Sequence, residues 1–258
     1  MRLFLIMLVW LAVPAVGQAD DVTDEKAKAA VPVALTLDEV ARLKSIFGAS
    51  SFEVAGDGTV TATYDFTTKD ASLTEAFSPP MEKTKQRIRW SRGLEGTWNT
   101  VEDGLIIADQ GVWLHKARWT EARMEAEYLS MSAVKKGDVL AAVFLPHKGK
   151  KLYGANLGQQ CVKLKPNVKL AAKPIPARFP VASVQNRFSF GLEIKNKVLT
   201  ALRNDRRAAD TANDPKFVRK AQPGQLGLAW RGTINGFIFK ITMTGKLDPA
   251  WVKKQLKS

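Results

Sequence analysis

Apolar and polar residues alternate most regularly between residues 120 and 131, TEARMEAEYLSM. Successive side chains of a β-strand point to opposite faces, so this alternation predicts a strand with one face in a core and the other in solvent. The side predicted to be buried carries Ala122, Met124, Ala126 and Tyr128. The side predicted to be exposed carries Glu121, Arg123, Glu125 and Glu127.

The same two-residue period recurs along most of the chain, interrupted by turn signals. Asp57-Gly58 and Asp103-Gly104 each divide an extended segment, because Asp-Gly tolerates the positive φ values of tight hairpin turns. Further turns are predicted at Asn196-Lys197 and Asn235-Gly236. After the last turn, the predicted core face carries Phe237, Phe239, Ile241 and Met243. Roughly ten to thirteen strands with no long helix among them predict an all-β fold, a two-sheet antiparallel β-sandwich of jelly-roll type.

A short helix is predicted at each end of this β region. Thr36 and Glu39 form a capping box, and the helix that they begin ends at Gly48. Asp248 and Pro249 are typical of the start of a second helix. Two proline-containing basic segments, 165–180 and 204–224, are predicted to be irregular surface loops, where functional residues often lie.

The first residues have the pattern of a secretory signal peptide. An apolar run follows Arg2, and the small residues Gly17 and Ala19 precede a plausible cleavage point, so residues 1–19 are predicted to be removed on export. Residues 20–35 are predicted to be a flexible leader, and residues 36–258 a single sandwich domain with flanking helices. We expect an exported protein, periplasmic or extracellular, with no transmembrane segment after cleavage.

The chain is strongly basic, with 39 Lys and Arg against 25 Asp and Glu and a net charge of +14. Such charge attracts polyanions, although it also serves solubility alone. One basic loop carries Arg203, Arg206, Arg207, Arg219 and Lys220. Nucleic acid is not expected, because no recognition fold or aromatic-basic motif is present. With two histidines and one cysteine, no zinc or copper site and no cofactor are predicted, while calcium stays open.

Three of the seven tryptophans lie within residues 98–119. Trp98 is predicted to pack at a sheet edge or in the interior. Trp113 alternates with Val112 and Leu114 and shares its face with His115. Aromatic faces either stack on sugar rings or fill a core. The candidate ligand-binding surface consists of Trp113, His115, Trp119 and Arg123, with core packing of the aromatic residues as the alternative.

Several turn and core segments resemble the concanavalin A-like lectin/glucanase superfamily. They are YDF at 64–66, Trp98, Val101, DGL at 103–105, Gly111, the strand from Thr120, GQLGL at 224–228 and FIFKITMTGKLDPAW at 237–251. More closely, they resemble exported bacterial domains related to the 3-keto-disaccharide hydrolase domain. The resemblance spans about residues 60–251 and implies the sandwich fold and carbohydrate chemistry. The Asn-Ser-Gly and Tyr-Glu-x-Gln motifs of that hydrolase-like family are not matched by KKGDVLAAVF or LYGANLGQQCVKL.

Glu125 and Glu127 are the candidate catalytic residues. Residues two apart in a strand are separated by about 6.6 Å, a spacing compatible with a pair of glycosidase carboxylates. The laminarinase-like members of the superfamily use the motif Glu-x-Asp-x-(x)-Glu on such a strand, and the position of its aspartate is Arg123 in this chain. The alternative is a charge ladder on an ordinary polar sheet face. The sequence therefore predicts an exported glycan-binding protein, with anionic glycans among the candidate ligands. The alternatives are a glycosidase-type hydrolase and a non-catalytic envelope structural or interaction protein.

Overall fold

The computed structural model describes residues 35–68, 70–78, 99–101, 104–107, 111–130, 138–149, 151–164, 167–169, 173–174, 187–214, 217, 222–231 and 236–257. The chain divides into two units, residues 1–32 and 33–258, and every described element belongs to the second. The predicted signal peptide, nearly all of the predicted leader and Trp98 lie outside the described residues.

The described strands form two antiparallel layers, called the first and the second sheet here, which are joined where Gly224 of the second pairs with Trp119 of the first. The first contains, in spatial order, β1 (Ser51–Val54), β2 (Val60–Asp65), β17 (Gly236–Leu247), β7 (Trp119–Ser130), β13 (Arg187–Lys195), β14 (Val198–Arg203), β15 (Arg206–Asp210) and β12 (Lys173–Pro174). Beside the start of β17, this sheet is extended by β5 (Gly104–Ile107) and β4 (Asn99–Val101).

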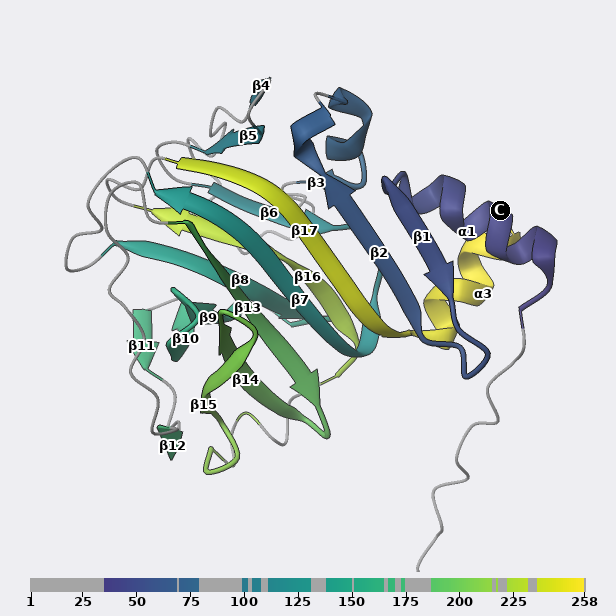
Figure 1. Ribbon diagram of the computed structural model, residues 1–258. Helices are drawn as coiled ribbons and strands as arrows, with labels where there is room; N and C mark the ends of the chain where they lie inside the picture. Colours follow the sequence, from purple (N-terminus) through teal and green to yellow (C-terminus); the bar gives the residue numbers. More distant parts are fainter. Residues whose placement is uncertain are drawn as a thin grey trace, which may run out of the picture. The chain divides into compact units, whose positions relative to one another are not determined.

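The second sheet faces the first across the core (Figure 1). It contains β3 (Phe77–Ser78), β6 (Gly111–His115), β16 (Gly224–Arg231), β8 (Val139–Pro146), β9 (Tyr153–Asn156), β10 (Gln160–Leu164) and β11 (Asn167–Lys169). Two 3-10 turns, η1 (Phe66–Thr68) and η2 (Ala71–Thr74), follow β2. The predicted two-sheet antiparallel β-sandwich is confirmed.

Strand β7 lies at the centre of the first sheet. It pairs along most of its length with β13 on one edge and with β17 on the other. Its even-numbered residues from 122 to 128 are buried, and the odd-numbered residues between them are partly exposed. The alternation seen in the sequence is therefore confirmed, and β7 fixes which faces of its neighbours point outward.

Strand β17 contains a β-bulge that the sequence pattern did not predict. Ile238 pairs with Tyr128 and Lys240 with Glu127, so two steps along β17 match one step along β7. The extra residue, Phe239, shifts the alternation by one position. Ile241 and Met243 are buried as predicted, whereas Phe237 and Phe239 are partly exposed on the opposite face. The prediction that all four residues share the core face was wrong for the two phenylalanines.

The hairpin turns were predicted with mixed success. Asn196 and Lys197 form the predicted two-residue turn, with φ values of 49° and 61°. Gly104 is the first residue of β5 and pairs with Val101. The two-residue connection between them therefore lies one position earlier than the predicted turn at Asp103-Gly104. Asp57-Gly58 lies within the longer connection between the paired residues Val54 and Val60. Asn235 of the fourth predicted turn lies outside the described residues.

The segment 204–224 is not irregular throughout. Asn204 and Asp205 form a tight turn with φ values of 47° and 62°, and residues 206–210 return as strand β15. Positive φ at both central residues is the conformation that joins two antiparallel strands with their natural twist. Asn and Asp both tolerate this conformation. Strand β15 was not predicted, because its charged and alanine residues show no alternation of apolar and polar positions.

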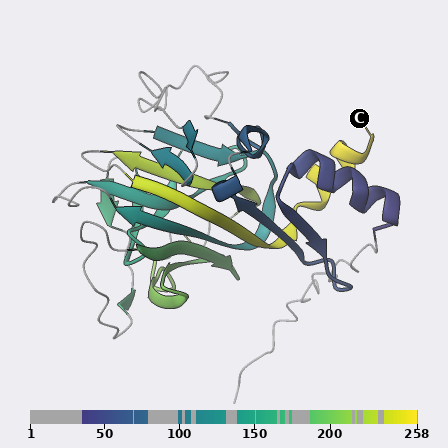
Figure 2. The same ribbon diagram turned by 45° about the horizontal axis from the view of Figure 1, so that its top comes forward.

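The two predicted helices are present and lie together beside β1 (Figure 2). They are α1 (Leu37–Phe47), which has the predicted capping box of Thr36 and Glu39, and α3 (Pro249–Lys257). Arg42 Nη1 in α1 donates a hydrogen bond of 3.2 Å to the carbonyl of Leu256 in α3.

Phe47, the last residue of α1, attaches this helix pair to the sandwich. Its ring is fully buried and lies 4.8 Å from the rings of Phe52 and His115, 5.9 Å from Trp119 and 6.2 Å from Trp251. It therefore contacts strand β1, the last residue of β6, the first residue of β7, and α3 together. Its own carbonyl accepts a hydrogen bond of 2.9 Å from the Tyr64 hydroxyl.

We predict that Phe47→Ala lowers the free energy of unfolding by about 3–5 kcal/mol, because a large cavity remains where several rings meet. Chemical denaturation followed by tryptophan fluorescence would measure the change. Leu37→Ala is the matched control on the same helix, since Leu37 is 89% exposed, and it should change stability by less than about 0.5 kcal/mol. Equal effects of the two substitutions would contradict the anchoring role of Phe47.

Candidate ligand-binding site

One outer face of the sandwich is apolar and the other is polar. The outer face of the second sheet carries a cluster of buried apolar residues that is separate from the core between the sheets. Its members are Val112, Leu114, Val139, Ala141, Val143, Leu152, Val162, Leu164 and Ala229. The outer face of the first sheet carries charged and hydroxyl side chains. This polar face consists of Thr61, Thr63, Asp65, Arg123, Glu125, Glu127, Arg187, Ser189, Glu193, Lys240, Thr242 and Thr244. A polar ligand would find partners there, so it is the candidate site.

The strand register arranges the polar face in rows that cross the sheet. One row runs from Asp65 through Lys240 and Glu127 to Ser189. The next row runs from Thr63 through Thr242 and Glu125 to Gly191. Directly paired residues on one face lie close enough to interact, so each row is a unit of side-chain contacts.

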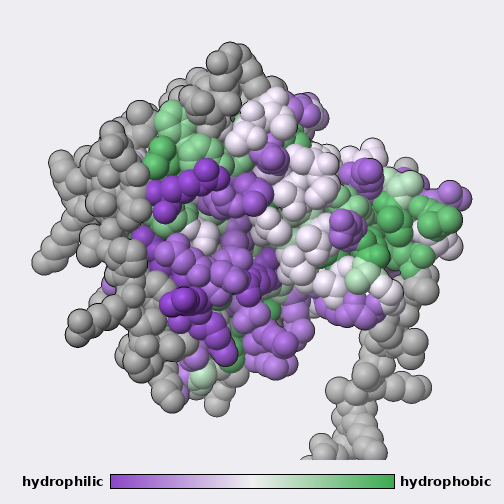
Figure 3. All heavy atoms as spheres, in the orientation of Figure 1, coloured by the Kyte–Doolittle hydropathy of each residue, from purple (hydrophilic) through white to green (hydrophobic). Residues whose placement is uncertain are grey.

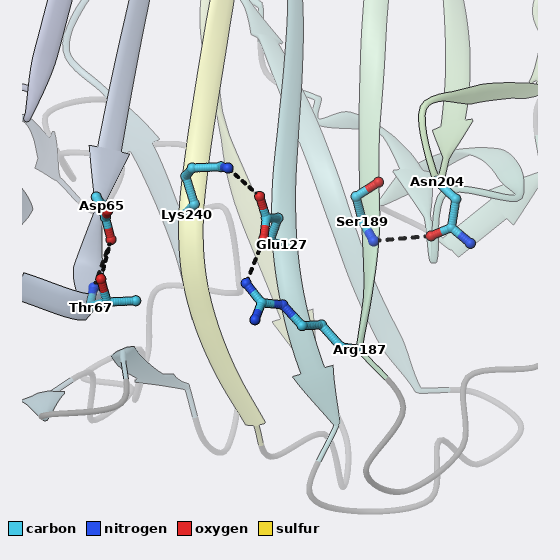
Figure 4. Close-up of polar contacts among 7 residues, drawn as sticks. All are labelled: Asp65, Thr67, Glu127, Arg187, Ser189, Asn204 and Lys240. Atoms are coloured by element: carbon cyan, nitrogen blue, oxygen red, sulfur yellow. Dashed lines mark hydrogen bonds and ion pairs between the residues drawn. The ribbon is translucent and has the colours of Figure 1, made fainter.

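Glu127 is the centre of an ion-pair cluster (Figure 4). Arg187 Nη2 lies 2.7 Å from Glu127 Oε2, and Lys240 Nζ pairs with Glu127 Oε1. Partial burial acts to raise the pKa of the Glu127 carboxyl, but the hydrogen bonds and charges of Lys240 and Arg187 outweigh it and lower the pKa. Glu127 is therefore a firmly ionised carboxylate at neutral pH.

One carboxylate oxygen of Glu125 is hydrogen-bonded, and the other has no partner. Arg123 donates to Glu125 Oε2 through Nε at 3.2 Å and Nη2 at 2.9 Å, and Arg123 also pairs with Asp205. Glu125 Oε1 is buried and has no hydrogen-bond partner. Gly191 pairs with Glu125 across the strands, and a Cβ atom there would lie 2.9 Å from Glu125 Cγ. The same Cβ atom would overlap the Met124 carbonyl oxygen, so only glycine permits this close approach of β13 to β7.

Two stacked phenylalanine rings stand at the edge of this polar cluster. Phe237 and Phe239 are partly exposed, with ring centroids 6.4 Å apart and planes at 24°. The Arg187 guanidinium lies 4.3 Å from the centre of the Phe239 ring. Figure 3 shows a hydrophilic area across the middle of the face, with a hydrophobic area beside it near the start of β17. The sequence reasoning missed this aromatic pair because the bulge reverses its predicted direction.

Ser189 and Asp65 at the two ends of their row are already engaged with neighbouring turns (Figure 4). The Ser189 backbone N–H donates to Asn204 Oδ1 at 3.1 Å. Asp65 Oδ1 accepts from the backbone N–H of Thr67 at 3.0 Å and from its hydroxyl at 2.6 Å. These bonds fix the backbone at Ser189 and the carboxylate of Asp65, and Glu125 Oε1 is the acceptor of this face that is buried without a partner.

The aromatic residues predicted to bind the ligand lie inside the core. Trp113 and His115 are 1% exposed and Trp119 is fully buried. The Trp113 ring stacks on Phe77 with a centroid distance of 4.0 Å. Trp113 and His115 project from β6 into the interior, whereas the glutamates of β7 project outward. The expectation of a sugar-stacking surface on these residues does not hold, and their packing is that of the alternative. Arg123 alone of the four residues lies on the polar face.

His115 is a structural residue whose two ring nitrogens are both engaged. The backbone N–H of Ala117 donates to Nδ1 at 3.1 Å, so Nδ1 carries no proton and Nε2 does. Nε2 lies 2.6 Å from the Tyr64 hydroxyl, which in turn donates to the carbonyl of Phe47. Burial, together with the charge of Lys116, lowers the pKa of His115 to about 3. This chain of bonds holds the neutral imidazole.

The predicted basic loop is not a single charged surface. Arg203 is fully buried, while Arg206 and Arg207 are exposed on β15, where Arg207 Nη2 donates to Thr200 at 3.4 Å. Arg219 and Lys220 lie outside the described residues. Arg203 was expected at the surface because of its charge, but strand parity places it with Leu199 and Ala201 on the core face.

Within the residues that the structure describes, no group of three or more His, Cys, Asp and Glu side chains is placed to hold a metal ion. Among the described helices, none is long and apolar enough to cross a bilayer.

Neither a family model nor a curated protein matches the chain. The closer resemblance to the 3-keto-disaccharide hydrolase-related domains therefore stays a prediction.

Among solved structures, the chain is similar to the Crh5 transglycosylase in complex with NAG, at 11% identity over 72% of this chain and 83% of that chain, with a TM-score of 0.47. It is similar to beta-agarase A from Zobellia galactanivorans at 11% identity over 73% and 93%, with a TM-score of 0.46. It is similar to the metal-free carbohydrate recognition domain of Emp46p at 10% identity over 66% and 96%, with a TM-score of 0.41. These are concanavalin A-like jelly-roll folds. Likeness at this level concerns the course of the backbone and says nothing about what this chain binds.

We predict that His115 makes stability depend on pH. Its pKa in the folded protein is about 3, below the ordinary 6.5, so between these values the unfolded chain binds a proton that the folded chain does not. Stability should therefore fall as the pH falls below about 6.5, with a slope of up to about 1.4 kcal/mol per pH unit.

Denaturant unfolding at several pH values between about 5 and 7, above the range where most carboxylates titrate, would measure this slope. His115→Gln should flatten the profile, although it lowers stability overall. His147→Gln is the comparison variant: partial burial and the charges of Arg118 and Lys148 also lower the pKa of His147, but His147 is partly exposed, so this substitution should reduce the slope less than His115→Gln does. Equal slopes in the original protein and in His115→Gln would contradict the prediction.

Proposed function

We propose that the chain binds a saccharide on the polar face of the first sheet. The observation that supports this most directly is the stacked pair Phe237 and Phe239 beside the Glu127 cluster and the unpaired acceptor of Glu125. A sugar ring offers an apolar C–H face and a rim of hydroxyl groups. A site that combines exposed aromatic rings with a few fixed polar groups matches both parts of such a ligand.

The charges on the polar face indicate what kind of saccharide it accepts. Arg187 and Lys240 are both paired with Glu127, and Arg123 is paired with Glu125 and Asp205. No cation among these three is left without a carboxylate, whereas Glu125 Oε1 still needs a donor. The face is therefore suited to hydroxyl groups that donate hydrogen bonds. A preference for anionic glycans would have to arise from the net charge of +14, through long-range attraction that salt screens.

Binding is better supported than hydrolysis. Glycoside hydrolysis needs one carboxyl group that is protonated at working pH, and the usual device is a raised pKa. The pKa of Glu127 is lowered by Lys240 and Arg187, and Arg123 holds Glu125 Oε2. The lowered pKa favours Glu127 as a carboxylate that accepts hydrogen bonds and does not donate a proton, and the ion pair with Arg123 engages one oxygen of Glu125.

Export belongs to the same proposal. The apolar run after Arg2 and the small residues before Asp20 are the basis for it. An exported location would place the polar face where extracellular or envelope polysaccharides are found.

We predict that Phe239→Ala and Glu125→Gln each weaken saccharide binding about tenfold, which corresponds to about 1.4 kcal/mol. The first substitution removes a stacking surface, and the second replaces the charged acceptor by a weaker one. Glycan-array retention, followed by affinity electrophoresis on the retained polysaccharide, would measure the change.

Glu75→Gln is the matched control for the carboxylate, because Glu75 is exposed at the end of η2 and does not belong to the strands of the polar face. It should leave affinity unchanged, and circular dichroism should show equal folding in all variants. Retention on no glycan, or equal retention of all variants, would contradict the proposal. Release of reducing sugars that is lost in both Glu125→Gln and Glu127→Gln would favour the hydrolase instead.

A further inference from the structure

Arg203 is a buried cation at one end of the sandwich interior. It is the last residue of β14, its residue exposure is 0%, and it lies on the core face of the strand. The following residues, Asn204 and Asp205, are exposed turn residues, so the guanidinium lies close to the surface although it is enclosed.

Part of the guanidinium is held by neighbouring groups. Nη1 donates a hydrogen bond of 3.1 Å to the carbonyl of Leu157, in the turn between β9 and β10. The Cζ atom lies 3.3 Å from the centre of the Phe188 ring, so one planar face is covered by a cation–π contact. These contacts fix the plane and the orientation of the group.

The remaining edge of the guanidinium has no hydrogen-bond partner. Nε and Nη2 are buried and have no hydrogen-bond partner. In arginine these two nitrogens direct parallel N–H bonds from the same side, which is the fork that binds a carboxylate or phosphate through two oxygens. The N–H bonds of this edge therefore have the directions that bind a two-oxygen anion, and the adjoining turns must move apart to admit one, because both nitrogens are shielded from solvent.

The charge of Arg203 is also uncompensated. None of the ion pairs between described residues includes Arg203, and the nearby Asp205 is paired with Arg123. Burial lowers the pKa of the guanidinium to about 10, which still leaves it protonated at neutral pH. A buried charge without a counter-charge is costly, and Arg206 adds positive charge across the hairpin.

We propose that Arg203 anchors an anion site between the β9–β10 turn and the β14–β15 turn, which takes an oxyanion that presents two oxygens to the Nε and Nη2 fork. The ligand class is a carboxylate or a phosphate-type ion. The carboxylate could belong to a uronic acid or to a free organic acid, and these sources are separated by the probes below. This site is distinct from the polar face, because Arg203 projects to the other side of the first sheet.

The direct test is an NMR titration of the Arg203 Nε–H resonance in the full chain, assigned by its absence from Arg203→Lys. Glucuronate, acetate and inorganic phosphate would each replace chloride at constant ionic strength. We expect a saturable shift of this resonance with the oxyanions. Preference for glucuronate over acetate would identify a uronic acid, and preference for phosphate would identify the inorganic ion.

Thermal unfolding gives a second measurement that does not depend on the resonance. The favoured oxyanion should raise the midpoint of the original protein in a saturable way, and Arg203→Lys, which keeps the charge but loses the fork, should bind it about tenfold more weakly. Arg206→Gln is the matched control and should keep most of the effect, because Arg206 is exposed.

Two results would overturn the proposal. Absence of any shift of the Nε–H resonance with all three probes would show that water alone satisfies the fork. An equal response to chloride and to the oxyanions would show a general ionic effect without two-oxygen recognition. Neither result bears on the polar face, whose glycan binding is measured with other variants.

Discussion

The fold and the candidate site both depend on strand β7 being paired on both edges. Backbone hydrogen bonds to β13 and β17 fix its register, and a shift of one residue would exchange its buried and exposed faces. Met124 and Tyr128 then lie in the core, and Glu125 and Glu127 lie outside. The same register brings Lys240 opposite Glu127 and Gly191 opposite Glu125. The register of β7 therefore decides which charged side chains meet on the polar face.

The sequence predicted those parts of the structure in which local pattern and burial agree. The alternation of β7, the capping box of α1 and the turn at Asn196-Lys197 each have a local physical cause, and each is confirmed. Strand β6 behaves differently, because all of its residues are buried and both of its faces contact apolar residues. In such a strand the sequence pattern does not distinguish the face toward the core from the outer face. The direction of the Trp113 and His115 side chains could therefore not be predicted from the sequence.

A single inserted residue explains why the aromatic part of the site was also missed. Without the bulge at Phe239, the alternation from Phe237 to Met243 would put Phe237, Phe239, Ile241 and Met243 into the core together. With the bulge, the two phenylalanines turn outward while Ile241 and Met243 stay inside. A bulge depends on pairing with β7 and leaves no strong local signature in the sequence. Bulges often redirect side chains near functional sites, which agrees with the stacked pair at the edge of the polar cluster.

Charged side chains occur in two physically different environments in this protein. On the polar face, carboxylates and cations pair in partial contact with solvent, where each pair contributes little to stability, on the order of 0–1 kcal/mol. Their role is to orient one another, and they leave a single acceptor unpaired at Glu125. Inside the sandwich, Arg203 has an aromatic ring and one carbonyl but no carboxylate. Burial strengthens the attraction between this fork and an anion, while the anion also loses its hydration. In the two proposals, the polar face thus contacts saccharide hydroxyl groups, and the buried fork contacts one charged group.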